Sequence, residues 1–222
     1  MALHHLDARE SKRLHGRITA LRAILSPESH LATLPMAPNP LPDQSIDQSV
    51  ILDIGCGTRK AEAGALGIDR SPGPVTDIVW DLDQYPWPLA SNRFERIHLS
   101  HIIEHVHDVM ATMGEVHRVA RPGASVFVTT PHFSSHNSYT DPTHVRHLAA
   151  ASFEHLTGKN FESFNGAPFR FDIQSLELTF GGNLVLDNLG RALARGNLKW
   201  YERHAAWVFP ALDIRCHLRA VK

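Results

Sequence analysis

The sequence has little of what marks secreted, membrane-spanning or nucleic-acid-binding proteins. Its only cysteines, Cys56 and Cys216, lie far apart and follow no apolar signal segment, so no disulfide framework is expected. No apolar run approaches the roughly 20 residues that a membrane-spanning helix needs. The formal net charge of -1, without a basic run, provides no field to attract nucleic acid or an anionic membrane. These absences predict a reduced, cytoplasmic protein, monomeric or homodimeric, with neither nucleic acid nor membrane as partner.

Histidine, by contrast, is abundant, with 16 residues in a chain of 222. It is the commonest metal ligand and the side chain that titrates near neutrality, so a surplus indicates metal or acid–base chemistry. Drift in surface composition would give the same surplus. The two explanations are separated only by the local clusters described below.

The composition changes near residue 50. Apolar residues recur near helical spacing from Leu3 to Leu25, which predicts an amphipathic helix. Five prolines then fall within residues 26–49, a pattern typical of an extended linker or lid. We therefore expect an N-terminal helix and linker over residues 1–49 and the folded domain over residues 50–222.

Short apolar runs bounded by glycine, proline or aspartate predict the strands of that domain. They are Val50–Ile54, Leu66–Ile68, Val75–Val79, Phe94–Leu99 and Ser125–Thr130, followed by two runs of antiparallel type at Gln174–Phe180 and Asp213–Val221. Apolar residues from Val106 to Ala120 repeat at helical spacing before an Arg-Pro-Gly stop. A strand, a helix and a strand in that order imply a right-handed parallel crossover. The pattern predicts an open, mostly parallel α/β sheet.

The stretch "DIGCGT" forms the first turn after a predicted strand. In open α/β sheets this turn contacts the ligand, and Gly55 and Gly57 allow its backbone to approach closely. Asp53 ends the first strand, and Asp69 ends the second, where a carboxylate can hydrogen-bond two ribose hydroxyls. A dinucleotide fingerprint needs a third glycine where Lys60 stands, so a nicotinamide-dependent oxidoreductase is disfavoured.

Five motifs in order, "DIGCG", "GID", "DL", "SHIIEHV" and "HRVARPGA", resemble those of the class I S-adenosylmethionine-dependent methyltransferases, near the small-molecule "type 11" branch. The resemblance spans Val50–Phe133 and implies a Rossmann-like, seven-stranded, mostly parallel sheet with an antiparallel C-terminal strand, flanked by helices. It also implies transfer of a methyl group from S-adenosylmethionine to a small-molecule acceptor. Arg59 replaces the third glycine of many members, which leaves the loop shape open. A metal- or ligand-binding module without transfer activity remains the alternative.

The resemblance also assigns residues to the cofactor. It places Asp53, Gly55, Cys56 and Gly57 around the methionine part, Asp69 and its neighbour Arg70 at the ribose, Asp81 and Leu82 at the adenine, and Ser100 with His101 in the methyl-transfer pocket.

A histidine-rich segment, residues 132–147, follows the fifth predicted strand, where the acceptor should bind. Imidazoles and a carboxylate on one loop can ligate a divalent metal or position an acidic substrate. The candidate metal ligands are His132, His136, Asp141 and His144, and the candidate bases are His132 or His144, then His101. Asp141 could instead cap a turn and helix start at Pro142. His101 and His105, four residues apart, could add ligands if that segment were helical, but a structural turn is favoured for His105.

Four aromatic residues precede the last predicted strand. Trp200, Tyr201, Trp207 and Phe209 could wall a pocket for an aromatic or heterocyclic substrate, but packing in a core or dimer interface is favoured.

Overall fold

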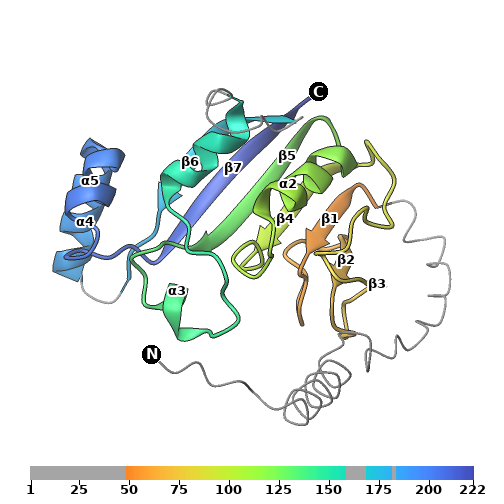
Figure 1. Ribbon diagram of the computed structural model, residues 1–222, viewed down its shortest axis with the longest axis horizontal. Coiled ribbons are helices and arrows are strands. Elements are labelled where there is room, and N and C mark those ends of the chain that lie inside the picture. The colour runs from red at the N-terminus through yellow and green to blue at the C-terminus, as the bar shows by residue number, and fades with distance from the viewer. Residues whose placement is uncertain (1–48, 159–168, 182–183) are drawn as a thin grey trace, which may run out of the picture. The chain divides into compact units, whose positions relative to one another are not determined.

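A computed structural model describes residues 49–158, 169–181 and 184–222 of the chain. Its centre is a seven-stranded sheet in the order β3-β2-β1-β4-β5-β7-β6 (Figure 1). The strands are β1 (Ile51–Ile54), β2 (Leu66–Asp69), β3 (Ile78–Val79), β4 (Phe94–Ser100), β5 (Ala120–Pro131), β6 (Arg170–Leu178) and β7 (Asp213–Val221). β7 runs antiparallel to both of its neighbours, whereas β1 to β5 pair in parallel. The predicted fold class is confirmed.

Burial explains why these segments form strands. All four residues of β1 are buried, as the continuous apolar run of a central parallel strand requires. β7 instead alternates, with Ile214, Cys216, Leu218 and Ala220 buried, which matches the predicted period of two. On the other face of the sheet, Phe127 stacks between His98 and His217 at ring-centroid distances of 5.2 and 4.5 Å. Part of the histidine surplus therefore serves packing.

The crossover from β4 to β5 contains the predicted helix, α2 (Val109–Val119). Asp108 caps it, because its carboxylate accepts from the N–H of Ala111 at 2.9 Å. Met113 and Val116 are fully buried against the sheet. β5 begins at Ala120, five residues earlier than predicted, so the Arg-Pro-Gly sequence that ends the helix lies inside the strand.

The connection between β1 and β2 has turns but no helix among residues 55–65. Side chains shape it instead. The Asp53 carboxylate accepts from the N–H of Ala61 at 2.6 Å, and Lys60 forms an ion pair with Asp77. Asp77 also accepts from the N–H of Gly67 at 2.7 Å. Lys60, at the position of the missing third glycine, thus ties this loop to the segment before β3.

Among the described residues, two short helices lie between β5 and β6, and two more lie between β6 and β7. They are α3 (Asn137–Thr140), the 3-10 helix η2 (Ala150–Thr157), α4 (Leu184–Gly196) and α5 (Leu198–His204). Tyr201 is fully buried in a second small core beneath α5, and its hydroxyl donates to the carbonyl of Phe209 at 2.6 Å. Trp200 is half exposed and Trp207 is largely exposed, whereas Tyr201 is buried, so the four aromatic residues do not form the wall of one pocket.

His132 joins three elements at the end of β5. Its ring is fully buried, and Nδ1 accepts from the N–H of Ser134 at 3.2 Å. Nε2 therefore carries the proton and donates to Oε1 of Glu202 on α5 at 3.1 Å. The same Oε1 accepts from the N–H of Ala150 at the start of η2. His132 is thus a structural cross-link.

The expected N-terminal helix and linker fall almost wholly within residues 1–48, outside the described residues, so the domain boundary at residue 50 stays a prediction. None of the helices in the described part of the chain is long and apolar enough to cross a membrane.

We predict that Gly55→Ala destabilises the fold more than Gly64→Ala. Both glycines have positive φ, +70° and +77°, so alanine at either site adopts a backbone conformation that costs about 1–2 kcal/mol. At Gly55 the new Cβ would also lie 2.6 Å from Cγ1 of Ile102, whereas at Gly64 it meets nothing within 4 Å. Urea unfolding should give a total loss of about 2–4 kcal/mol for Gly55→Ala. Equal losses for the two variants would contradict the contact with Ile102.

We also predict that His132→Ala lowers the free energy of unfolding by about 3 kcal/mol, because it leaves the Glu202 carboxylate without its buried partner. The matched control is His136→Ala, at an exposed histidine whose side chain makes no cap hydrogen bond to α3. The control should unfold at the wild-type urea concentration. If His132→Ala did the same, the cross-link would carry no stability.

Candidate active site

The carboxyl ends of β1, β2, β4 and β5 lie at one edge of the sheet (Figure 1). The strand order reverses there, since β2 and β3 lie on one side of β1 and β4 and β5 on the other. Ligands of open α/β sheets bind in the crevice at such a reversal. The predicted cofactor residues and the predicted acceptor residues follow these strand ends.

The glycine turn is anchored to the end of β2. Gly55 and Gly57 have φ angles of +70° and +52°, so both lie in the left-handed region that favours glycine. The N–H of Gly57 donates to Oδ2 of Asp69 at 2.9 Å, and the N–H of Ser71 donates to Oδ1 at 2.9 Å. A Cβ on Gly57 would meet no atom within 4 Å, so the backbone of this turn borders open space. The turn and the carboxylate together form a cradle.

Asp53 and Cys56 support this turn from inside. Asp53 is 2 % exposed, and burial raises the pKa of its carboxyl group. Cys56 is also buried, with Sγ 3.8 Å from the carbonyl oxygen of Val75, and burial raises the pKa of its thiol. The side chain of Cys56 therefore packs over β2 and does not border the open space beside Gly57.

The remaining predicted cofactor residues differ in exposure. Asp81, Arg70 and Ser100 are exposed near the ends of β3, β2 and β4. Leu82 is buried in the main core, and its carbonyl accepts from Nε1 of Trp87 at 3.1 Å. Leu82 therefore does not face a ligand itself, but its burial fixes the position of the neighbouring Asp81.

His101 begins the turn after β4. Its φ of +52° is rare for a residue with a Cβ and marks a backbone held by its surroundings. Its N–H continues the ladder by donating to the carbonyl of Thr129 at 2.8 Å. Its side chain is half exposed, and Nδ1 lies 3.4 Å from Oε1 of Glu104, which raises the pKa of His101. The segment is a turn and not a helix, so His101 and His105 are not one helical turn apart.

Glu104 is a buried carboxylate that sequence reasoning missed. It is 1 % exposed, and its Oε2 accepts from Oγ1 of Thr130 at 3.0 Å. Its Oε1 is buried without an aligned hydrogen bond. Its backbone carbonyl accepts from the N–H groups of Val145 and Arg146. The sequence signal that could have identified Glu104 was its position between the apolar Ile103 and His105.

The two hydrogen bonds from Val145 and Arg146 to the carbonyl of Glu104 bring the "DPTH" segment against the turn after β4. Oδ1 of Asp141 accepts from both the N–H and the Oγ1 of Thr143, at 2.8 and 2.7 Å, which lowers the pKa of Asp141. The predicted turn at Asp141 is thus present, but no helix follows it. The rings of His105 and His144 meet edge to face, with centroids 4.6 Å apart.

The four predicted metal ligands do not converge. Both ring nitrogens of His132 are engaged, Nδ1 with Ser134 and Nε2 with Glu202, and His136 is exposed beside α3. Oδ2 of Asp141 lies 3.9 Å from Nε2 of His144, so only these two of the four are close. Within the described ranges, the group of side chains with metal-ligand spacing is Glu104, His105 and His144. Of the three predicted bases, His132 is not accessible, whereas His101 and His144 both lie beside Glu104.

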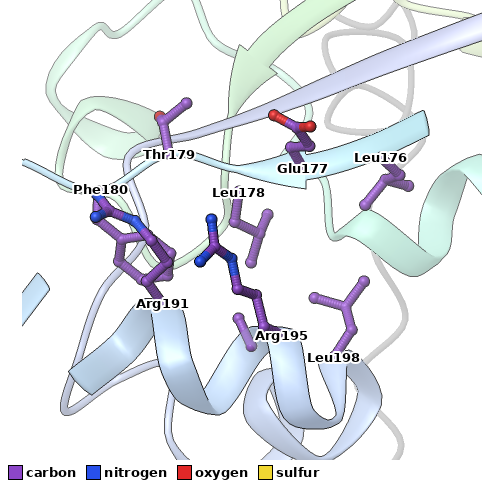
Figure 2. Close-up of a pocket in the computed structure, with 9 residues that line it drawn as sticks. Leu176, Glu177, Leu178, Thr179, Phe180, Arg191, Arg195 and Leu198 are labelled. Atoms are coloured by element: carbon purple, nitrogen blue, oxygen red, sulfur yellow. The ribbon is translucent and has the colours of Figure 1, made fainter. Parts of the chain in front are cut away.

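A separate pocket of about 480 Å³ lies at the end of β6, against α4 (Figure 2). Arg191 and Arg195 of α4 extend toward Leu178 and Phe180, and the guanidinium of Arg191 lies 5.9 Å from the ring centroid of Phe180. None of the predicted cofactor or acceptor residues lines this pocket. It therefore does not replace the edge at β1 and β4 as the candidate site.

Comparison with solved structures supports the fold. A methyltransferase dependent on S-adenosylmethionine from Archaeoglobus fulgidus has 17% identity and a TM-score of 0.55 over 79% of this chain and 88% of its own. A putative methyltransferase from Bacillus halodurans has 13% identity and a TM-score of 0.51 over 78% and 92%. The YcgJ protein of Bacillus subtilis has 14% identity and a TM-score of 0.50 over 78% and 91%. No curated protein sequence matches.

Sequence comparison identifies the family. Residues 28–178, well over half of the chain, match the family described as "Methyltransferase domain". The enzyme class and the S-adenosylmethionine cofactor predicted from the motifs agree with this match and with the fold. The chain therefore belongs to the methyltransferase domain family.

Proposed function

We propose that this chain transfers the methyl group of S-adenosylmethionine to a small-molecule acceptor that binds beside His101. The observation that carries this proposal is the cradle at the end of β1. The left-handed Gly57 and the anchored Asp69 leave a backbone turn open to a ligand at the reversal of strand order. The acceptor class, the oligomeric state and the cytoplasmic location stay predictions.

The cradle residues fit an adenosyl ligand. Each oxygen of Asp69 accepts one backbone N–H, and a carboxylate has about four acceptor positions, so capacity remains for ribose hydroxyls. The open space at Gly57 lets the turn approach the rest of the ligand. Lys60 is engaged with Asp77, so it does not supply the close helix packing of a dinucleotide fingerprint.

Positioning is the main contribution that the protein makes to such a reaction. The bound sulfonium supplies an activated methyl group, so the chain must hold the acceptor in line with it, which is worth about 7–11 kcal/mol. Gly55 contacts Ile102, so the cofactor turn and the turn after β4 are in direct contact. An acceptor between these turns would lie next to the cofactor.

His101 is the residue we assign as general base. Its Nδ1 faces Glu104, which leaves Nε2 as the atom that takes the proton of the acceptor. Half of its side chain is exposed at the strand end, whereas His132 is fully buried. Glu104 is a positioning residue, because it orients the imidazole of His101 without reaching the reaction itself.

The test is ligand binding by Asp69→Ala. S-adenosylhomocysteine at 100 times its dissociation constant should stabilise the wild type by about 2.7 kcal/mol in thermal unfolding. Asp69→Ala should lose this shift, because the ribose loses its acceptor and Gly57 loses its anchor. The melting temperature without ligand shows whether the variant is folded.

The matched control is Asp172→Ala on β6, which removes a carboxylate that pairs with Arg170 at the far end of the sheet. It should keep the full shift. A shift with NAD and none with S-adenosylhomocysteine would contradict the proposed cofactor, and an unchanged shift in Asp69→Ala would contradict the assigned cradle.

A further inference from the structure

We propose that Glu104, His105 and His144 form a binding site for a divalent transition metal of the zinc type. One ligand atom from each side chain lies within 4.8 Å of those of the other two. Two histidines and one carboxylate, with a coordination position left open, are the donor set of many catalytic zinc sites. This set differs from the one expected from the sequence, with which it shares only His144.

Hydrogen bonds orient both imidazoles for metal binding. Nδ1 of His144 lies 3.3 Å from the carbonyl oxygen of Ser138, which can only accept, so this nitrogen carries the proton. Nδ1 of His105 lies 3.3 Å from the carbonyl oxygen of Thr143 and donates in the same way. In each neutral ring the lone pair is therefore on Nε2. Metal-binding histidines are held by such bonds from the other nitrogen to a carbonyl group.

Thr143 adds an independent argument for this tautomer of His105. Its Oγ1 donates to Oδ1 of Asp141 at 2.7 Å, so toward Nδ1 of His105, at 3.0 Å, it can only accept. Both oxygens of Thr143 thus fix the proton on Nδ1. The side chain of Asp141 is in turn fixed, with Oδ2 left 3.9 Å from Nε2 of His144.

Glu104 supplies the observation that points to a ligand. Its Oε2 is satisfied by Thr130, but its Oε1 is buried and has no aligned hydrogen bond. A buried carboxylate oxygen that makes no aligned hydrogen bond requires an explanation. Nε2 of His144 lies 4.0 Å away, and Nδ1 of His101 lies 3.4 Å away. A cation held by Oε1 and one ring nitrogen of each of His105 and His144 would satisfy it.

The distances and charges fit a divalent ion. Two ligands about 2.0–2.1 Å from a tetrahedral zinc ion are about 3.4 Å apart. The 4.0 Å between Glu104 and His144, and spacings of up to 4.8 Å within the group, therefore close when the side chains move inward as the ion binds. The carboxylates of Glu104 and Asp141 supply two negative charges, and the neutral imidazoles supply none. The second lone pair of Oε1 can still face His101.

The use of this metal rests on the proposed methyl transfer, whereas its binding does not. An acceptor oxygen, nitrogen or sulfur in the open position would become more acidic and would be held next to Nε2 of His101. The site would thus select acceptors that carry a metal-binding group.

The test is Zn²⁺ binding by the full-length, untagged protein after dialysis against a chelator. Calorimetry should show one equivalent bound by the wild type at neutral pH. His105→Gln should weaken binding by more than about 100-fold, beyond the 10–100-fold typical of a change outside the ligand set. His136→Gln, which alters a histidine of the set expected from the sequence, should bind as the wild type does.

Co²⁺ provides a spectroscopic check, because its visible absorption depends on its ligands and should change in Glu104→Gln and His105→Gln. Binding far below one equivalent by the wild type, or unchanged binding by His105→Gln, would overturn the site. The S-adenosylhomocysteine shift is measured on the same samples. If that shift persists while zinc does not bind, the metal site fails and the proposed methyl transfer stands.

Discussion

The arrangement of the acceptor side depends on one buried residue, Glu104. Its backbone carbonyl binds the N–H groups of Val145 and Arg146, and its side chain binds Thr130 at the end of β5. A charged group inside a protein is stable only when its surroundings compensate it, so the turn after β4 and the loop after β5 are constrained together. The proximity of His101 and His144 follows from this constraint.

The cofactor side depends on a different contact. The absence of a side chain at Gly55 lets Ile102 pack against the turn, and Gly57 reaches the carboxylate of Asp69. These two contacts join the ends of β1, β2 and β4. The chain thus builds a ligand cradle and an acceptor site from adjoining turns, although the "DIGCG" and "DPTH" segments lie far apart in the sequence.

The sequence predicted the sheet well because burial leaves a simple periodic pattern. β7 matched its predicted bounds, and α2 matched its apolar spacing. The start of β5 was missed because Arg121, Pro122 and Gly123 are typical of a loop. In the structure these exposed residues lie at the beginning of β5, where its pairing with β4 is irregular and proline is tolerated.

The site was harder to predict because spacing along the chain shows which residues share a loop, but not what that loop contacts. His132 has the same residue type and neighbourhood as His144, yet its partner is Glu202 from α5. Glu104 and His105 belonged to a motif that already had a structural explanation. The hydrogen bonds from Val145 and Arg146 to the backbone of Glu104 bring these two residues to His144, and spacing along the chain does not reveal them.

Hydrogen–deuterium exchange of the full-length protein with and without S-adenosylhomocysteine tests the central claim most directly. We predict slower exchange at residues 53–57, 69–71 and 100–104, the three turns that meet at the reversal of strand order. Slower exchange confined to residues 176–180 and 191–198, around the separate pocket in Figure 2, would contradict it.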